Sequence, residues 1–248
     1  MESSTTLRQW IFDTLKAPKV NYYQKSLEEI AKIPAGKKPR LLLHACCGPC
    51  SCFPLTFLCE HFDVTIYYNN SNIYPESEYD RRRDELKKLL KDIKEDYAYD
   101  VRLIVPAYDN ALYNKDLAPY ADAREGGERC LVCYRKRMKE AYDFAEKEGY
   151  DYFCTVMIIS RQKNSQVLNR IGKELEEQDH HKTKYFYSDL KKNNGIEIGR
   201  QMRIHYGLYN QLYCGCVYTY QDGLRRQKEH EIMENASESE CLSTDSQK

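Results

Sequence analysis

The chain has 248 residues, enough for one large domain or two small ones with an ordinary hydrophobic core. Its 38 basic and 38 acidic residues cancel, which argues against a protein that coats nucleic acid by bulk attraction but leaves local basic patches open. No run approaches about 18 apolar residues and no secretory signal opens the chain, so we expect a cytoplasmic protein outside the membrane.

Strands alternate with helices along most of the chain. A helical extension over residues 1–38 precedes a continuous apolar run at 40–45, which is typical of a buried strand in a parallel sheet. Three more strands are predicted, at 64–68, 101–105 and 152–159. Helices are predicted at 53–61, from Pro75 onward with a capping box at 77–80, at 129–148 capped by Gly149, at 165–178 and at 199–213.

This alternation favours an α/β fold, doubly wound around a mostly parallel sheet. We assign residues 39–226 to this α/β domain. Residues 227–248 are rich in Glu, Ser, Asn and Lys, which predicts a disordered tail in which Cys241 has no functional role.

The eleven cysteines are too many to be incidental in a chain of this length. In a reducing compartment such thiols bind metal or cycle through redox states. Cys46 and Cys47 follow the first strand, where doubly wound sheets bind their ligands, and Cys130 and Cys133 share one helical face. Together they supply four sulfurs, enough for a [4Fe–4S] cluster or a tetrahedral zinc, and two adjacent ligands favour the cluster. Residues 39–226 are therefore predicted to be a metal-binding catalytic domain.

The remaining cysteines allow several interpretations. Cys50 is a possible ligand of a second mononuclear metal, or a packing residue of the following helix, as Cys52 is. Cys59 and Cys154 lie inside predicted elements and are expected to be core residues. In Cys214-Gly215-Cys216 the two sulfurs could form a strained, redox-active disulfide, act as further metal ligands, or be unreactive turn residues.

Four segments together resemble the QueH-type epoxyqueuosine reductases. They are Leu43-His44-Ala45-Cys46-Cys47-Gly48-Pro49-Cys50, the stretch 67–75 with Glu78, Tyr79 and Arg82, Cys130-x-x-Cys133 with Arg137, and Tyr213-Cys214-Gly215-Cys216. The resemblance extends from about residue 40 to residue 221. One departure is Leu190-Lys191-Lys192 after Asp189, where a Phe-Arg-Lys-like segment is expected.

The resemblance implies reduction of the epoxide of epoxyqueuosine in a tRNA anticodon loop to the alkene of queuosine. It implies a [4Fe–4S] cluster on Cys46, Cys47, Cys130 and Cys133, and a redox-active disulfide between Cys214 and Cys216. It also implies the sandwich fold of adenine-nucleotide hydrolases, of the HUP type. The reaction needs an electron donor, which the sequence does not identify.

The other participants are predicted from residue chemistry. A proton donor is required, for which His44, Asp189 or a tyrosine are candidates. Basic runs at 81–83 and 135–137, with Arg200 and Arg203, fit either contacts to tRNA phosphates or solvated helix faces.

Three alternatives remain open. The first is a non-enzymatic module in which zinc on the four thiolates supports an interaction surface. The second is a PP-loop-like nucleotide enzyme, although no Gly-x-x-x-x-Gly-Lys-Ser/Thr or Gly-x-Gly-x-x-Gly segment is present. The third is a plain thiol–disulfide oxidoreductase, which the number and dispersal of the cysteines disfavour.

Overall fold

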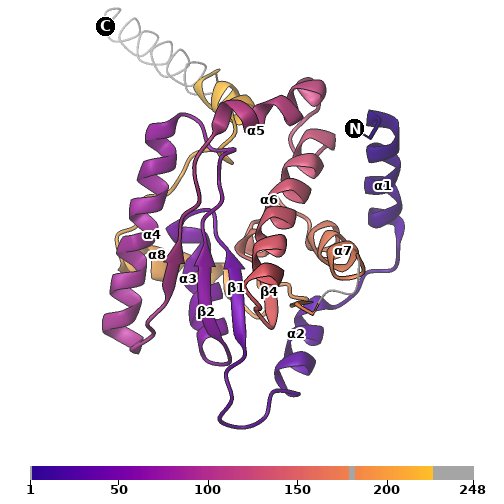
Figure 1. Cartoon of the computed structure of the whole chain (residues 1–248). Coiled ribbons are helices and arrows are strands. Elements are labelled where there is room, and N and C mark those ends of the chain that lie inside the picture. The colour runs from indigo at the N-terminus through magenta and orange to yellow at the C-terminus, as the bar shows by residue number, and fades with distance from the viewer. Residues whose placement is uncertain (1, 179–181, 226–248) are drawn as a thin grey trace, which may run out of the picture.

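Five parallel strands form the centre of the protein in the computed structural model, which describes residues 2–178 and 182–225 (Figure 1). The strand order is β3-β2-β1-β4-β5. The strands are β1 (Arg40–His44), β2 (Asp63–Tyr67), β3 (Arg102–Ile104), β4 (Tyr152–Thr155) and β5 (Lys184–Tyr185). The chain winds outward from β1 in both directions, so the switch point of the topology lies between β1 and β4, where Leu42 is paired with Phe153. The doubly wound parallel fold is confirmed.

Helices cover both faces of the sheet (Figure 1). One face carries α3 (Gly48–Cys59), α4 (Glu76–Tyr97) and α8 (Gly195–His205). The other carries α1 (Ser4–Lys16), α6 (Glu128–Lys147) and α7 (Ser165–Glu176), while α2 (Tyr22–Ile30) and α5 (Asn110–Leu117) are peripheral. Because strand side chains alternate between faces, Leu41 and Leu43 pack toward α3 and α4, whereas Leu42 packs toward α6 and α7. All three leucines are fully buried.

The N-terminal extension is part of this packing. Leu7 of α1 is 1% exposed and belongs to the same hydrophobic cluster as α6 and α7. The indole of Trp10 donates a hydrogen bond to Glu174 of α7 at 2.6 Å. The predicted tail, with Cys241, lies outside the described residues. No helix in the described ranges combines the length and apolar character needed to cross a membrane.

Several predicted boundaries are wrong, each for a local reason. The fourth strand ends at Thr155, whose hydroxyl accepts the amide of Met157 and begins a 3₁₀ turn over Val156–Ile159. The helix predicted at 199–213 is Gly195–His205, and it ends before Gly207, whose positive φ of 59° breaks the helix. A further helical stretch at 217–225, which was not predicted, follows it. The helix after β1 begins at Gly48, so it includes Cys50 and Cys52.

Two further differences concern helix ends and elements that the pattern did not predict. Pro75 is the N-cap of α4 and no side chain caps that helix, so the predicted capping box is absent. Gly149, with φ of 67°, does follow the end of α6 as expected. Both α5 and β5 were unpredicted, because eight and two residues are too few for a clear hydrophobic period.

Candidate metal centre

The first group of thiols lies where β1 passes into α3. Cys47 is the N-cap of α3 in an extended conformation, and Cys50 lies in the first turn of that helix. The Cys46 and Cys47 sulfurs are 3.8 Å apart, and with Cys50 all three sulfurs lie within 4.8 Å of one another. Cys52, by contrast, is fully buried and its sulfur faces the Gly48 carbonyl, and Cys59 and Cys154 are core residues as predicted.

The three thiols affect one another strongly. Hydrogen bonds from Cys47 and Cys50 hold the pKa of Cys46 well below its usual range. The same bonds raise the pKa of Cys47, and the bond with Cys46 raises that of Cys50 to about 12. The group therefore accommodates one thiolate readily. A bound cation or cluster would let all three ionise, as metal ligation by thiolates requires.

The second group begins α6. Cys130 and Cys133 are 6% and 8% exposed, and burial raises the pKa of both, to about 12 for Cys130. The amide of Gly126 donates to the Cys130 sulfur at 3.2 Å, and the hydroxyl of Tyr113 reaches the Cys133 sulfur at 3.4 Å. Protein donors thus already face both sulfurs.

The third group is the loop that follows α8, and it is fixed by α4. Arg82, 1% exposed, donates to the carbonyls of Tyr213 and Cys214 at 3.0 and 2.9 Å, and its own charge is paired with Glu78 at 2.8 Å. The Gly215 carbonyl accepts from the Tyr74 amide. Cys214 and Cys216 are free thiols in the structure. The family-like residues Glu78 and Arg82 therefore position the Cys-Gly-Cys loop.

Two cations connect these groups. Arg137 is 2% exposed, and its Nε and Nη2 have no hydrogen-bond partner among the described residues. Burial alone would lower the pKa of Arg137, but its electrostatic interaction with the ionisable side chains of Cys133, Tyr113, Cys214 and Cys46 raises it. Burial opposes the charge of Lys163 too, and the Cys214 and Cys46 thiolates likewise raise its pKa. Thiols from all three groups thus act on Arg137, and thiols of the first and third groups act on Lys163.

A small cavity opens between the groups. We call it the thiol pocket: it has a volume of 150 Å³, and Cys46, Cys50, Cys214, Lys163 and Gln211 are among the residues that line it. The Gln211 amide donates to the Cys47 sulfur at 3.1 Å and lies 3.7 Å from that of Cys50. The pocket lies at the carboxyl ends of the strands, where a doubly wound fold binds its ligand.

These residues fit an iron–sulfur cluster. A cluster held by four thiolates is an anion whose sulfurs accept hydrogen bonds, and a buried guanidinium with two free N–H groups supplies both countercharge and donors. The three sulfurs within 4.8 Å also fit a single soft ion, since thiolate bonds of about 2.3 Å in a tetrahedron place sulfurs roughly 3.8 Å apart. This group of three sulfurs includes Cys50, which is not among the four predicted cluster ligands, Cys46, Cys47, Cys130 and Cys133.

The predicted proton donors are differently placed. His44 is fully buried against Thr155, and burial together with the charge of Arg137 lowers its pKa to about 3, so near neutral pH it is a neutral imidazole without an acidic imidazolium proton. Asp189 accepts a hydrogen bond from Ser165 and pairs with Lys191, which makes it a structural group at the start of α7. Neither supports the role of general acid.

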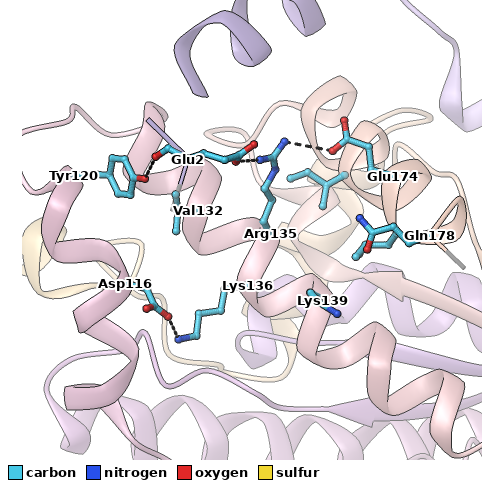
Figure 2. Close-up of a pocket in the computed structure, with 11 residues that line it drawn as sticks. Glu2, Asp116, Tyr120, Val132, Arg135, Lys136, Lys139, Glu174 and Gln178 are labelled. Carbon is cyan, nitrogen blue, oxygen red and sulfur yellow. Dashed lines mark hydrogen bonds and ion pairs between the residues drawn. The ribbon is translucent and has the colours of Figure 1, made fainter. Parts of the chain in front are cut away.

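Most of the predicted basic patches are neutralised within the protein. Arg137 and Arg82 are buried, so neither contacts phosphate nor forms a solvated face, and Arg200 is paired with Glu197. Figure 2 shows a 580 Å³ cavity on the outer side of α6, where Arg135 points to Glu2 and Glu174 and Lys136 to Asp116. Neither Cys130 nor Cys133 is among the residues that line this cavity.

Sequence reasoning missed Gln211, Tyr113 and Lys163. No pattern singles out Gln211 or Tyr113, because their contacts come from loops and elements far apart in the chain. Lys163 could have been found, since it closely follows the carboxyl end of β4, beside the topological switch point.

Comparison with known proteins gives a consistent result. A family model described as "Epoxyqueuosine reductase QueH" matches residues 41–222. Curated relatives called epoxyqueuosine reductase QueH include those of Streptococcus pyogenes serotype M1 (36% identical, covering 81% of this chain and 78% of that protein) and Staphylococcus epidermidis (35%, 84% and 88%). A third relative, from Thermotoga maritima, is 30% identical, and the match covers 77% of this chain and 95% of that protein.

One solved structure is also similar, the U34-tRNA thiolase NcsA from Methanococcus maripaludis with its [4Fe-4S] cluster. It superposes with a TM-score of 0.42 at 12% identity, covering 88% of this chain and 74% of that one.

Proposed function

Because the chain belongs to the epoxyqueuosine reductase QueH family, we propose that it reduces the epoxide of epoxyqueuosine in tRNA to the alkene of queuosine. The reaction consumes two electrons and two protons and releases the epoxide oxygen as water. The observation that carries the proposal is the buried guanidinium of Arg137, which lies among cysteines from three distant segments and whose Nε and Nη2 have no hydrogen-bond partner in the part of the chain that the structure describes. These features suit a protein that holds a redox-active, sulfur-rich group.

We propose that Cys46, Cys47, Cys130 and Cys133 hold a [4Fe–4S] cluster. Such a cluster supplies electrons one at a time. The residues around it have separate tasks: Arg137 provides hydrogen-bond donors and positive charge, Tyr113 and Gly126 donate to Cys133 and Cys130, and the Cys46 sulfur faces the thiol pocket.

Cys214 and Cys216 are proposed to act as a redox pair beside that cluster. Oxidation of two thiols to a disulfide releases two electrons and two protons, which equals the demand of epoxide reduction. The Cys214 side chain lines the thiol pocket together with Cys46, which supports electron exchange there. An external donor then restores the dithiol. A second metal on Cys50, with Cys46 and Cys47 nearby, is supported by the separation of their sulfurs.

The test is an anaerobic assay on tRNA that carries the epoxide, with protein before and after cluster reconstitution and a chemical reductant as donor. We expect queuosine to form with the reconstituted protein alone. Cys46→Ser and Cys133→Ser should lose both turnover and the brown absorbance near about 400 nm that is typical of thiolate-bound iron. Absence of turnover in fully reconstituted protein would contradict the proposal.

A zinc-thiolate interaction module is the second candidate. The 3.8 Å separation of the Cys46 and Cys47 sulfurs favours it, since a single tetrahedral ion places thiolates at about this distance. Metal analysis with sulfide determination on anaerobically purified protein distinguishes the two: zinc without acid-labile sulfide would support the module and exclude the reductase.

A further inference from the structure

A second cavity lies beside the thiol pocket, and five of the twelve residues that line it are basic. It has a volume of 490 Å³, and we call it the basic groove for its basic residues Lys19, Arg161, Lys163, Lys191 and Lys192. The one acidic residue among those that line it is Asp189, which is tied to Ser165 and Lys191. Lys163 lines both cavities, so the basic groove begins where the thiol pocket ends.

The cations of the basic groove are available to a ligand. Within the described ranges, no carboxylate lies within 4.0 Å of Lys19, Arg161, Lys163 or Lys192, and only Lys191 has an ion-pair partner. Glu197, whose pKa the charge of Arg161 helps to lower, is itself bound by Arg200 at 2.6 Å. This sets the basic groove apart from the outer face of α6, where Arg135 and Lys136 are paired (Figure 2).

The backbone adds positive potential to the same place. Both α2 and α7 begin at the basic groove, because Asn21 and Asn164, their N-caps, line it. Helix N-termini present free N–H groups and the positive end of the helix dipole to an anion. The two helix starts are fixed to each other, since the Gln166 side chain exchanges hydrogen bonds with both the amide and the carbonyl of Val20 at 3.1 and 2.9 Å. The basic groove is therefore built before any ligand arrives.

The sizes of the two cavities indicate how they share a substrate. The thiol pocket, at 150 Å³, is smaller than the roughly 300 Å³ at which small-molecule pockets begin. Under the proposed function, on which this step depends, only the epoxide-bearing ring fits there, and the sugar and phosphates must lie outside. We infer that the basic groove binds the backbone phosphates that flank the reacting nucleotide of tRNA.

The test changes three exposed cations and leaves the thiol pocket intact. The variant K19Q/R161Q/K192Q spares Lys163, which faces the thiols, and Lys191, which holds two backbone carbonyls. Binding of the reconstituted protein to a fluorescent anticodon stem-loop without the epoxide is measured over a series of KCl concentrations. We expect about thirtyfold weaker binding at physiological salt and a salt slope shallower by about 2, the effect of losing three phosphate contacts.

The matched control is K87Q/K91Q/K94Q, which removes the same net charge from α4, at the opposite side of the molecule from α2 and α7 (Figure 1). Iron content and thermal melting verify that both variants are folded. The control should bind like the wild type. Unchanged binding in the groove variant, or an equal loss in the control, would overturn the inference. A different outcome would contradict the proposed function alone. In that case the wild-type protein would not reduce the epoxide, but its binding to the stem-loop would still be weakened by K19Q/R161Q/K192Q, which supports the basic groove.

Discussion

Two arginines on α6 show how burial decides the role of a charged residue. Arg135 and Arg137 are two positions apart, and their side chains therefore point to different sides of the helix. Arg135 is paired with Glu2 and Glu174 and stacks on the Trp10 ring. Arg137 is instead buried among thiols, and two of its guanidinium nitrogens have no hydrogen-bond partner among the described residues. A buried charge without partners is strongly unfavourable, so Arg137 indicates an anionic acceptor in the functional protein.

Replacing Arg137 with Gln should lower the reduction potential of the proposed cluster. Hydrogen bonds and positive charge near the sulfurs favour the more negative, reduced state. We expect a shift of about −60 mV, a tenfold change for a one-electron couple, in an anaerobic redox titration followed by electron paramagnetic resonance. Arg135→Gln, on the outer side of the same helix, should leave the potential unchanged. Equal reduction potentials in the wild type, Arg137→Gln and Arg135→Gln would show that Arg137 does not tune the cluster.

Replacing Cys214 with Ser should separate electron storage from cluster binding. Cys214 lines the thiol pocket but lies outside the proposed ligand set, so the brown colour and iron content should stay at wild-type values. Repeated turnover should cease, because no dithiol can re-form. Product counted per protein over time checks this, and undiminished multiple turnover would exclude the redox pair.

At the scale of elements, the loop after α8 depends on α4 and on the segment before it. Tyr213 donates a hydrogen bond to the Tyr74 carbonyl, Gly215 accepts one from the Tyr74 amide, and Arg82 binds two further carbonyls of the loop. The loop is thus held by two residues, Tyr74 and Arg82. Cys214 is presented by this framework, whereas Cys216 directly precedes the helical stretch at 217–225, where its carbonyl accepts the amide of Tyr220.

Gly215 is the position in that loop least able to change. Its φ of 134° is a conformation that favours glycine, and a Cβ there would lie 3.1 Å from both Arg82 Nη1 and Ile73 Cγ1. Gly215→Ala should therefore reduce the free energy of unfolding by about 1–3 kcal/mol, measured by urea denaturation. Gly223→Ala has open space around its Cβ and should be neutral or stabilising. Equal stability of the two variants would show that the loop tolerates the strain.

At the scale of the whole molecule, the metal centre joins parts of the chain that are far apart. Cys46, Cys130 and Cys214 come from the ends of β1, the start of α6 and the loop after α8. A cluster bound to the first two segments cross-links the folded state, because the unfolded chain does not hold these thiols together.

Cluster removal should therefore destabilise the entire domain. We expect the melting temperature of reconstituted protein to exceed that of the metal-free protein by about 10 °C, which corresponds to roughly 3 kcal/mol for a chain of this size. Anaerobic thermal unfolding followed by circular dichroism measures the difference. Cys46→Ser, treated identically, should show no such increase. If the melting curves of wild-type protein with and without the cluster coincide, the cluster does not stabilise the folded state.

Much of the fold could be predicted because strands and helices have different hydrophobic periods. The runs that form β1 and β2 were found to within one residue at each end. The strand predicted at 152–159 is too long, because a strand and a buried 3₁₀ turn can both have a continuous apolar sequence. Helix α8 was placed too late because tyrosines continue past His205, and only Gly207 marks the break.

The order of the main elements and the sheet type could be predicted from hydrophobic periodicity, and the chemistry of thiols indicated which cysteines are candidate ligands. Only the tertiary structure decided which charges are free. It buries Arg82 and Arg137, pairs Arg135, and gathers Lys19, Arg161 and Lys192 beside the thiol pocket. A charge run looks the same in sequence whether it faces solvent, a carboxylate or the interior, because burial and pairing depend on residues far away in the chain.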